Sequence, residues 1–109
     1  MKKLIAIWTL IFGISASAMA SPYAFPVPFV EKDPPPTGHI TFNELPASGT
    51  IRILTISGEE VRSLDIPPNA GRRHWDLNNS SGKRVATGVY LFFVDGDGQQ
   101  TTGKLVVIR

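Results

Sequence analysis

Beyond residue 20, short runs rich in apolar and β-branched residues are separated by clusters of Gly, Pro, Asn and Ser. The clusters recur about every 8–12 residues, a spacing typical of a β-sandwich or β-barrel. No stretch of residues 21–109 repeats apolar positions with helical periodicity over three turns, so no helix is expected. The pattern predicts seven strands, at residues 24–30, 39–45, 50–56, 60–66, 72–77, 89–95 and 102–108.

The breaks between these strands carry turn chemistry. Ser57-Gly58 predicts a tight hairpin between the third and fourth strands. Residues 78–82, Asn-Asn-Ser-Ser-Gly, predict a turn whose side chains bond nearby backbone groups. Gly96-Asp97-Gly98 predicts the last hairpin. The prolines of residues 22–36 make the first strand an irregular edge segment, because proline has no N–H for a strand ladder.

The first twenty residues have the three-part layout of a cleavable secretory signal. Lys2 and Lys3 precede the apolar run 4–14, and Ala18-Met19-Ala20 offers small residues at a cleavage site. The alternative is a membrane anchor, but a spanning helix needs ~20 residues. We therefore expect residues 1–20 to be a signal peptide and residues 21–109 to be one domain. Within it, residues 21–38 are a Pro-rich edge strand and loop, and residues 39–109 the remainder of the sandwich.

Charge and cysteine content exclude several classes. The formal net charge of +2 comes from Lys2 and Lys3, so the exported chain is neutral. The remaining basic residues are scattered rather than gathered in the basic stripe of a nucleic-acid-binding protein. There is no cysteine, so neither disulfides nor thiolate metal sites are available to support a small core.

Several segments resemble one family of bacterial exported modules. The segments are residues 24–29 (AFPVPF), 40–42 with 45–46, 51–62, 75–79 with 82–90, and 102–109. The most specific is 75–79 with 82–90, which contains the Trp-Asp-Leu and Thr-Gly-Val-Tyr blocks. Together they are similar to the FlgD-like immunoglobulin-like domains, a group that overlaps with the C-terminal sorting domains of type IX secretion substrates. The resemblance implies an immunoglobulin-like antiparallel β-sandwich of about seven strands.

It also implies a function without catalysis, namely sorting, surface attachment or structural interaction. The expected partners are proteins of the secretion or attachment machinery, or neighbouring extracellular domains, and the expected location is the periplasm, the cell surface or the medium. The alternative function is an extracellular module that binds carbohydrate or another surface ligand. We expect no cofactor, no nucleic acid partner and no membrane span after cleavage.

Two groups of residues could carry chemistry. His74 and Asp76 share a face of their strand, but no nucleophile motif accompanies them, so an ordinary strand surface is favoured over catalysis. Asp95-Gly96-Asp97-Gly98 resembles part of a calcium loop, yet no closing glutamate follows, and a hairpin turn explains the Asp-Gly pairs. We expect neither a catalytic nor a metal site.

The large aromatic residues predict the core. Trp75 is expected to be a core anchor, and Tyr90 to act as a tyrosine corner, whose hydroxyl bonds nearby backbone. If Tyr90 points inward, Phe92 does too, because strand side chains alternate. Leu91 and Phe93, with Val89, then form an apolar outer face. Either the first strand or a loop covers this face, or a partner contacts it.

The last predicted strand completes this candidate interaction surface. Lys104, Val106 and Ile108 share a face, and Arg109 follows them at the end of the sequence. We expect a terminal strand on a sheet edge, whose unpaired backbone groups would suit strand addition by a partner. The alternative is that this strand only closes the sheet.

Overall fold

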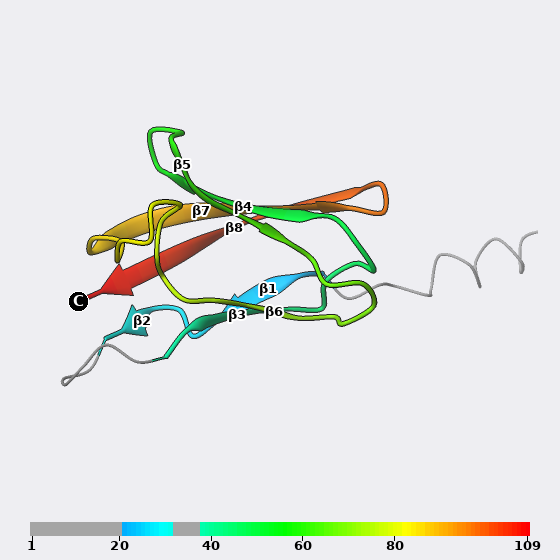
Figure 1. Cartoon of the computed structure of the whole chain (residues 1–109), viewed down its shortest axis with the longest axis horizontal. Helices are drawn as coiled ribbons and strands as arrows, with labels where there is room; N and C mark the ends of the chain where they lie inside the picture. Colours follow the sequence, from blue (N-terminus) through cyan, green and yellow to red (C-terminus); the bar gives the residue numbers. More distant parts are fainter. Residues whose placement is uncertain (1–20, 32–37) are drawn as a thin grey trace, which may run out of the picture.

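The computed structural model describes residues 21–31 and 38–109. These residues form eight strands and no helix, arranged in two facing sheets (Figure 1). The predicted all-β sandwich is therefore confirmed. None of the described residues forms an apolar helix of membrane-spanning length. The signal peptide predicted at residues 1–20 lies outside the described residues.

The two sheets differ in size. The smaller sheet has the order β1-β3-β6, with β1 (Tyr23–Phe25), β3 (Ile40–Asn43) and β6 (Arg73–Trp75). The larger sheet has the order β2-β8-β7-β4-β5, with β2 (Phe29–Val30), β8 (Gln99–Ile108), β7 (Gly88–Gly96), β4 (Thr50–Thr55) and β5 (Glu60–Asp65). All neighbouring strands are antiparallel except β2 and β8.

The predicted first strand, residues 24–30, is two strands in different sheets. β1 pairs with β3, whereas β2 pairs in parallel with the end of β8. Pro26 and Pro28 lie between them and cannot donate to a ladder, so pairing stops there and the chain crosses from one sheet to the other. The prediction of one edge strand was wrong, and the count rises to eight.

The prediction that the sequence ends on a free edge strand was also wrong. β7 pairs with one side of β8, and β2 pairs with the other side at Val107 and Ile108. Val107 is in register with Phe29, and Ile108 with Val30. The Ile108 carbonyl also accepts a hydrogen bond from the Glu31 amide at 2.8 Å. The end of β8 therefore lacks the free backbone groups that strand addition requires.

The predicted turns form by the expected chemistry. Asn79 Oδ1 accepts hydrogen bonds from the backbone N–H groups of Ser81 and Lys83, both at 2.9 Å. In the last hairpin, Asp97 and Gly98 have φ of 51° and 74°. Two consecutive positive φ values match the twist of a tight hairpin between β7 and β8.

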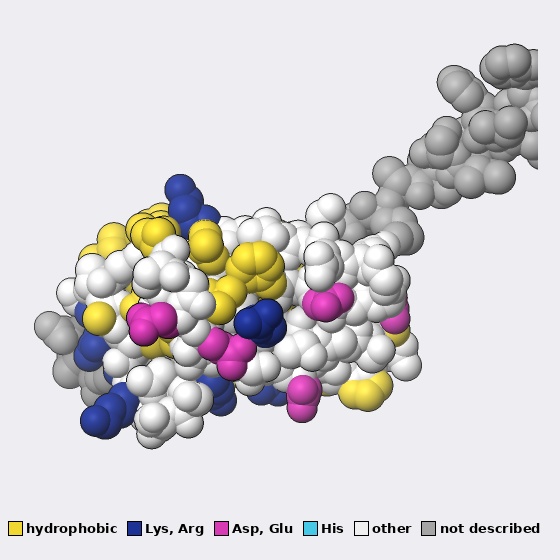
Figure 2. All heavy atoms as spheres, turned by 90° about the horizontal axis from the view of Figure 1, so that it is seen from above, with side chains coloured by type: hydrophobic (Ala, Val, Ile, Leu, Met, Phe, Trp, Pro, Cys, Tyr) yellow, Lys and Arg dark blue, Asp and Glu magenta, His cyan; other side chains and the backbone are white. Residues whose placement is uncertain are grey.

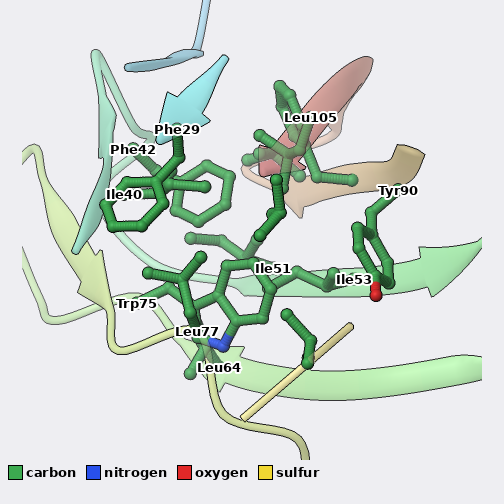
Figure 3. Packing of buried hydrophobic residues seen from close by; sticks show 14 of the residues in the cluster. Phe29, Ile40, Phe42, Ile51, Ile53, Leu64, Trp75, Leu77, Tyr90 and Leu105 are labelled. Atoms are coloured by element: carbon green, nitrogen blue, oxygen red, sulfur yellow. The ribbon is translucent and has the colours of Figure 1, made fainter. Parts of the chain in front are cut away.

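The core fills the space between the sheets. Side chains from both layers converge there (Figure 3). Phe42 of the small sheet meets Phe92 of the large sheet edge to face, with ring centroids 5.2 Å apart. Such pairs add about 0.5–1.5 kcal/mol beyond their buried area. Strands of both sheets contribute side chains to this one core.

Candidate interaction surface

The outer face of the five-stranded sheet carries a continuous apolar strip. Cross-strand register sets Leu54 opposite Leu91, and Val89 opposite Val106. Residues directly opposite each other in a ladder share a face. The strip runs from β2 across β8 and β7 to β4, and its members are Val30, Leu54, Val89, Leu91, Phe93, Val106 and Ile108. We call this set the outer strip.

The outer strip lies at the surface of the molecule. Figure 2 views the molecule from the side of this sheet and shows apolar side chains gathered there. Val30 and Ile108 are 51% and 41% exposed. The members on β7 and Val106 on β8 are half-buried, and Leu54 is buried. The small sheet packs on the opposite face (Figure 1). Monomeric proteins rarely leave contiguous apolar patches exposed unless these serve an interaction.

Two basic residues border the strip. Lys104 lies opposite Leu91 and Arg52 lies opposite Phe93, and both are exposed. Arg52 Nε donates to Glu60 Oε1 at 2.9 Å, so its charge is paired on its own sheet. Of the six residues predicted for the interaction surface, five belong to this face: Leu91, Phe93, Lys104, Val106 and Ile108.

The sixth, Arg109, is tied to the body of the domain. Its Nη1 donates to the Val85 carbonyl at 3.0 Å, and its Nε to Glu31 Oε2 at 3.3 Å. Its backbone N–H donates to Thr87 Oγ1 at 3.0 Å. Arg109 is exposed, but its backbone N–H and its guanidinium are both engaged in hydrogen bonds.

Glu31 is the centre of this ionic cluster. Arg84 Nε donates to Glu31 Oε1 at 2.7 Å, while Arg109 takes the other carboxylate oxygen. Desolvation raises the pKa of Glu31, but the hydrogen bonds and charges of the two arginines outweigh it and hold that pKa below its ordinary value. The cluster joins β2, the loop before β7 and the end of β8.

The predicted core residues occupy the interior. Trp75 and Phe92 are buried, and Trp75 Nε1 donates to the Asn78 carbonyl at 2.9 Å. Tyr90 is buried too, and its hydroxyl donates to the Ala86 carbonyl at 2.6 Å, the bond expected of a tyrosine corner. Burial raises the pKa of Tyr90 above its ordinary value. None of these rings is on the surface for a ligand.

The residues considered as catalytic or metal-binding candidates form hydrogen bonds within the domain instead. His74 Nδ1 lies 3.0 Å from Thr41 Oγ1, whereas Asp76 Oδ1 accepts from Arg62 at 3.2 Å and from the Asn78 amide at 3.0 Å. Asp97 Oδ2 accepts from the Ala47 amide at 3.0 Å, which fixes the last hairpin. Among the described residues, no three His, Asp or Glu side chains lie close enough to hold a metal.

Sequence reasoning missed part of the surface. Leu54 belongs to the outer strip yet is only 8% exposed, and Val30 joins it through the separate strand β2. Alternation from Ile51 and Ile53, both buried, would have placed Leu54 outward. Tyr23 and Phe25, which are exposed on the small sheet, were not predicted as surface residues. No residue of the first strand indicated which of its sides faces the core.

Comparison with known proteins gives structural relatives but no sequence family. No protein-family model matches the sequence, and no curated protein matches it significantly. The fold is similar to part of PorZ, an essential bacterial surface component of the type IX secretion system of Porphyromonas gingivalis. The match has a TM-score of 0.69 and 25% identity, over 87% of this chain and 12% of PorZ.

A second solved structure, dimeric latent PorU of Porphyromonas gingivalis, shares the fold. It matches with a TM-score of 0.54 and 24% identity, over 82% of this chain and 10% of PorU. The chain thus spans about a tenth of the length of either protein. It is similar to one all-β domain of larger proteins, one of which is a secretion-system surface component.

Proposed function

We propose that this chain is a non-catalytic, exported β-sandwich module that binds a protein of a bacterial envelope export or surface-attachment machinery. The outer strip carries the proposal. It is an apolar sheet face at the surface, bordered by Lys104 and Arg52, in a chain whose core is complete without it. Interfaces of this kind have an apolar centre and a charged rim.

Two further observations support the proposal. One is the likeness to a domain of PorZ, a surface component of a secretion system. The other is that the three candidate catalytic or metal-binding residues, His74, Asp76 and Asp97, each form a hydrogen bond within the domain. The layout of residues 1–20 adds the expectation of export. The proposed location is the periplasm, the cell surface or the medium.

A delivery assay tests this function. A reporter enzyme is placed between a signal peptide and residues 21–109 in a bacterium that has a type IX system, and its surface-exposed fraction is measured by protease accessibility. Leu91→Glu with Phe93→Glu puts two charges in the strip without touching the core. We expect the surface fraction to fall several-fold while the melting temperature of the purified domain stays within a few degrees.

The matched control is on the opposite sheet. Tyr23→Ser with Phe25→Ser removes two exposed rings that are not part of the strip, and delivery should stay at the wild-type level. If the folded Leu91→Glu, Phe93→Glu variant is delivered as well as the wild type, the strip is not the docking surface.

A further inference from the structure

The outer face of the small sheet carries a second set of exposed rings. Tyr23 and Phe25, on β1, are 47% and 43% exposed. They lie on one side of the strand, with ring centroids 5.9 Å apart and planes 32° from parallel. The Tyr23 hydroxyl accepts a hydrogen bond from the Asn43 amide at 3.1 Å, which steadies the ring. Large aromatic rings held at the surface beside polar groups are typical of ligand-binding faces.

The same face carries a histidine pair. In cross-strand register, Phe25 is opposite Thr41, and Thr41 is opposite His74, so the three share one face. Thr41 is buried between its neighbours and bonds His74 Nδ1 at 3.0 Å. His39 lies two positions before Thr41, and its ring centroid is 4.0 Å from that of His74. Both histidines are exposed.

The electrostatic surroundings of the pair are basic. Desolvation, followed by the charges of His39, Arg72 and Arg73, holds the pKa of His74 below its ordinary value. Asp76 directly follows the end of β6, but its carboxylate is bonded to Arg62. Thr41 on β3, the strand packed against His74, is uncharged, and Glu44 follows the far end of β3, beyond Asn43. This end of the face therefore favours an anion.

We propose that the outer face of the small sheet binds an anionic saccharide, with a sugar ring stacked on Tyr23 and Phe25 and an acidic substituent beside His39 and His74. Strands lie about 4.8 Å apart, so Phe25 and His74 are separated by about 10 Å across two strand spacings. One sugar ring does not span that distance, so the ligand is an acidic disaccharide or longer glycan. The C–H faces of sugar rings are apolar and can stack on Tyr23 and Phe25, whereas the sugar hydroxyls are polar and can bond Asn43.

This inference is independent of the outer strip, which lies on the other sheet. The histidine pair also makes binding at this face depend on pH. An acidic group bound beside the pair stabilises the imidazolium form, so binding takes up protons and the pKa of His74 rises in the complex. Affinity should therefore increase as the pH falls from 7.5 to 5.5, a range in which sugar carboxylates and sulfates stay ionised.

The test is a calorimetric titration of residues 21–109 with trigalacturonate and with a heparin-derived tetrasaccharide, beside neutral galactotriose. We expect at least one acidic probe to bind about tenfold more tightly than galactotriose, and several-fold more tightly at pH 5.5 than at pH 7.5. Tyr23→Ala with Phe25→Ala should weaken it about tenfold, and His74→Gln should flatten its pH dependence. Ile56→Ala, at an exposed position in the β4–β5 hairpin, is the control and should bind as the wild type does.

Three outcomes would overturn the proposal. The first is binding of neither acidic saccharide. The second is affinity unchanged by the loss of both rings, which would leave only charge attraction. The third is equal or tighter binding of inorganic phosphate or a ten-nucleotide oligothymidylate, which would assign the face to a bare anion or to single-stranded nucleic acid. NMR titration of the His74 ring, with and without the saccharide, checks the pKa rise separately from affinity.

Discussion

Gly103 lies under the ring of Phe92, and an added methyl group there has a calculable effect. The two residues are directly opposite in the β7–β8 ladder, with Phe92 pointing into the core. A Cβ atom on residue 103 would stand 2.3 Å from Phe92 Cε2 and Cζ. Non-bonded carbons rest about 3.5–4.0 Å apart, so the ring would have to move by more than about 1 Å.

The expected change in unfolding free energy follows from two opposing effects. Overpacking of a core costs about 1–3 kcal/mol. Replacing a strand glycine by alanine returns about 0.5–1 kcal/mol of backbone entropy. Gly103→Ala should therefore destabilise the domain by about 1–2 kcal/mol, which lowers the melting temperature by roughly 5–15 °C in a domain of this size.

Gly88→Ala is the matched control. Gly88 is in the same sheet, and neither glycine has a left-handed backbone. At position 88 the added Cβ would meet only Tyr90 Cε1 at 3.9 Å, an ordinary contact. Its melting temperature, measured by circular dichroism at the same pH and heating rate, should equal that of the wild type or exceed it by a few degrees.

A double-mutant cycle decides whether the ring is the cause. In a Phe92→Leu background the clashing atoms are gone, so Gly103→Ala should cost at least about 1 kcal/mol less than in the wild type. If Gly103→Ala costs the same in both backgrounds, or costs nothing in the wild type, the packing of Phe92 over Gly103 is not what limits this position.

Three other outcomes follow from the structure. Trp75→Ala should abolish cooperative thermal unfolding or nearly so, because losing a buried large aromatic costs about 3–5 kcal/mol and a small domain has roughly 5–10 kcal/mol; a melt within a few degrees of wild type would contradict this. The pKa of Glu31 is lowered on folding, so its stabilisation is present above the unfolded pKa near 4.5 and is lost as the pH falls through the folded value. Glu31→Gln should thus lower the melting temperature at pH 7, with the difference from wild type shrinking below pH 4, whereas a constant difference would argue against the ionic cluster. His74 is a base whose pKa is lowered on folding, so the wild type should lose stability as the pH falls below 6.5, and melts at pH 7 and pH 5 should show a smaller loss for His74→Gln.

The sequence determined the class of fold and the direction of many side chains. Alternation along residues 89–95 placed Tyr90 and Phe92 inward and Leu91 and Phe93 outward, as the structure has them. This works because strand side chains have a period of two, so one inward residue fixes its neighbours. Turn residues fixed most of the strand boundaries for an equally local reason, since Gly and Asn supply the backbone angles and capping bonds that turns need.

Tertiary structure decided what depends on distant pairing. The ion pair of Glu31 and Arg109 joins residues 78 positions apart, and His39 meets His74 only because β3 pairs with β6. A second distant pairing, between β2 and β8, places residues 29–30 in the large sheet, covers the end of β8 and adds Val30 to the outer strip. The local pattern of apolar and polar residues does not reveal which strands pair. The pairing depends on which faces are buried together, and that is a property of the whole chain.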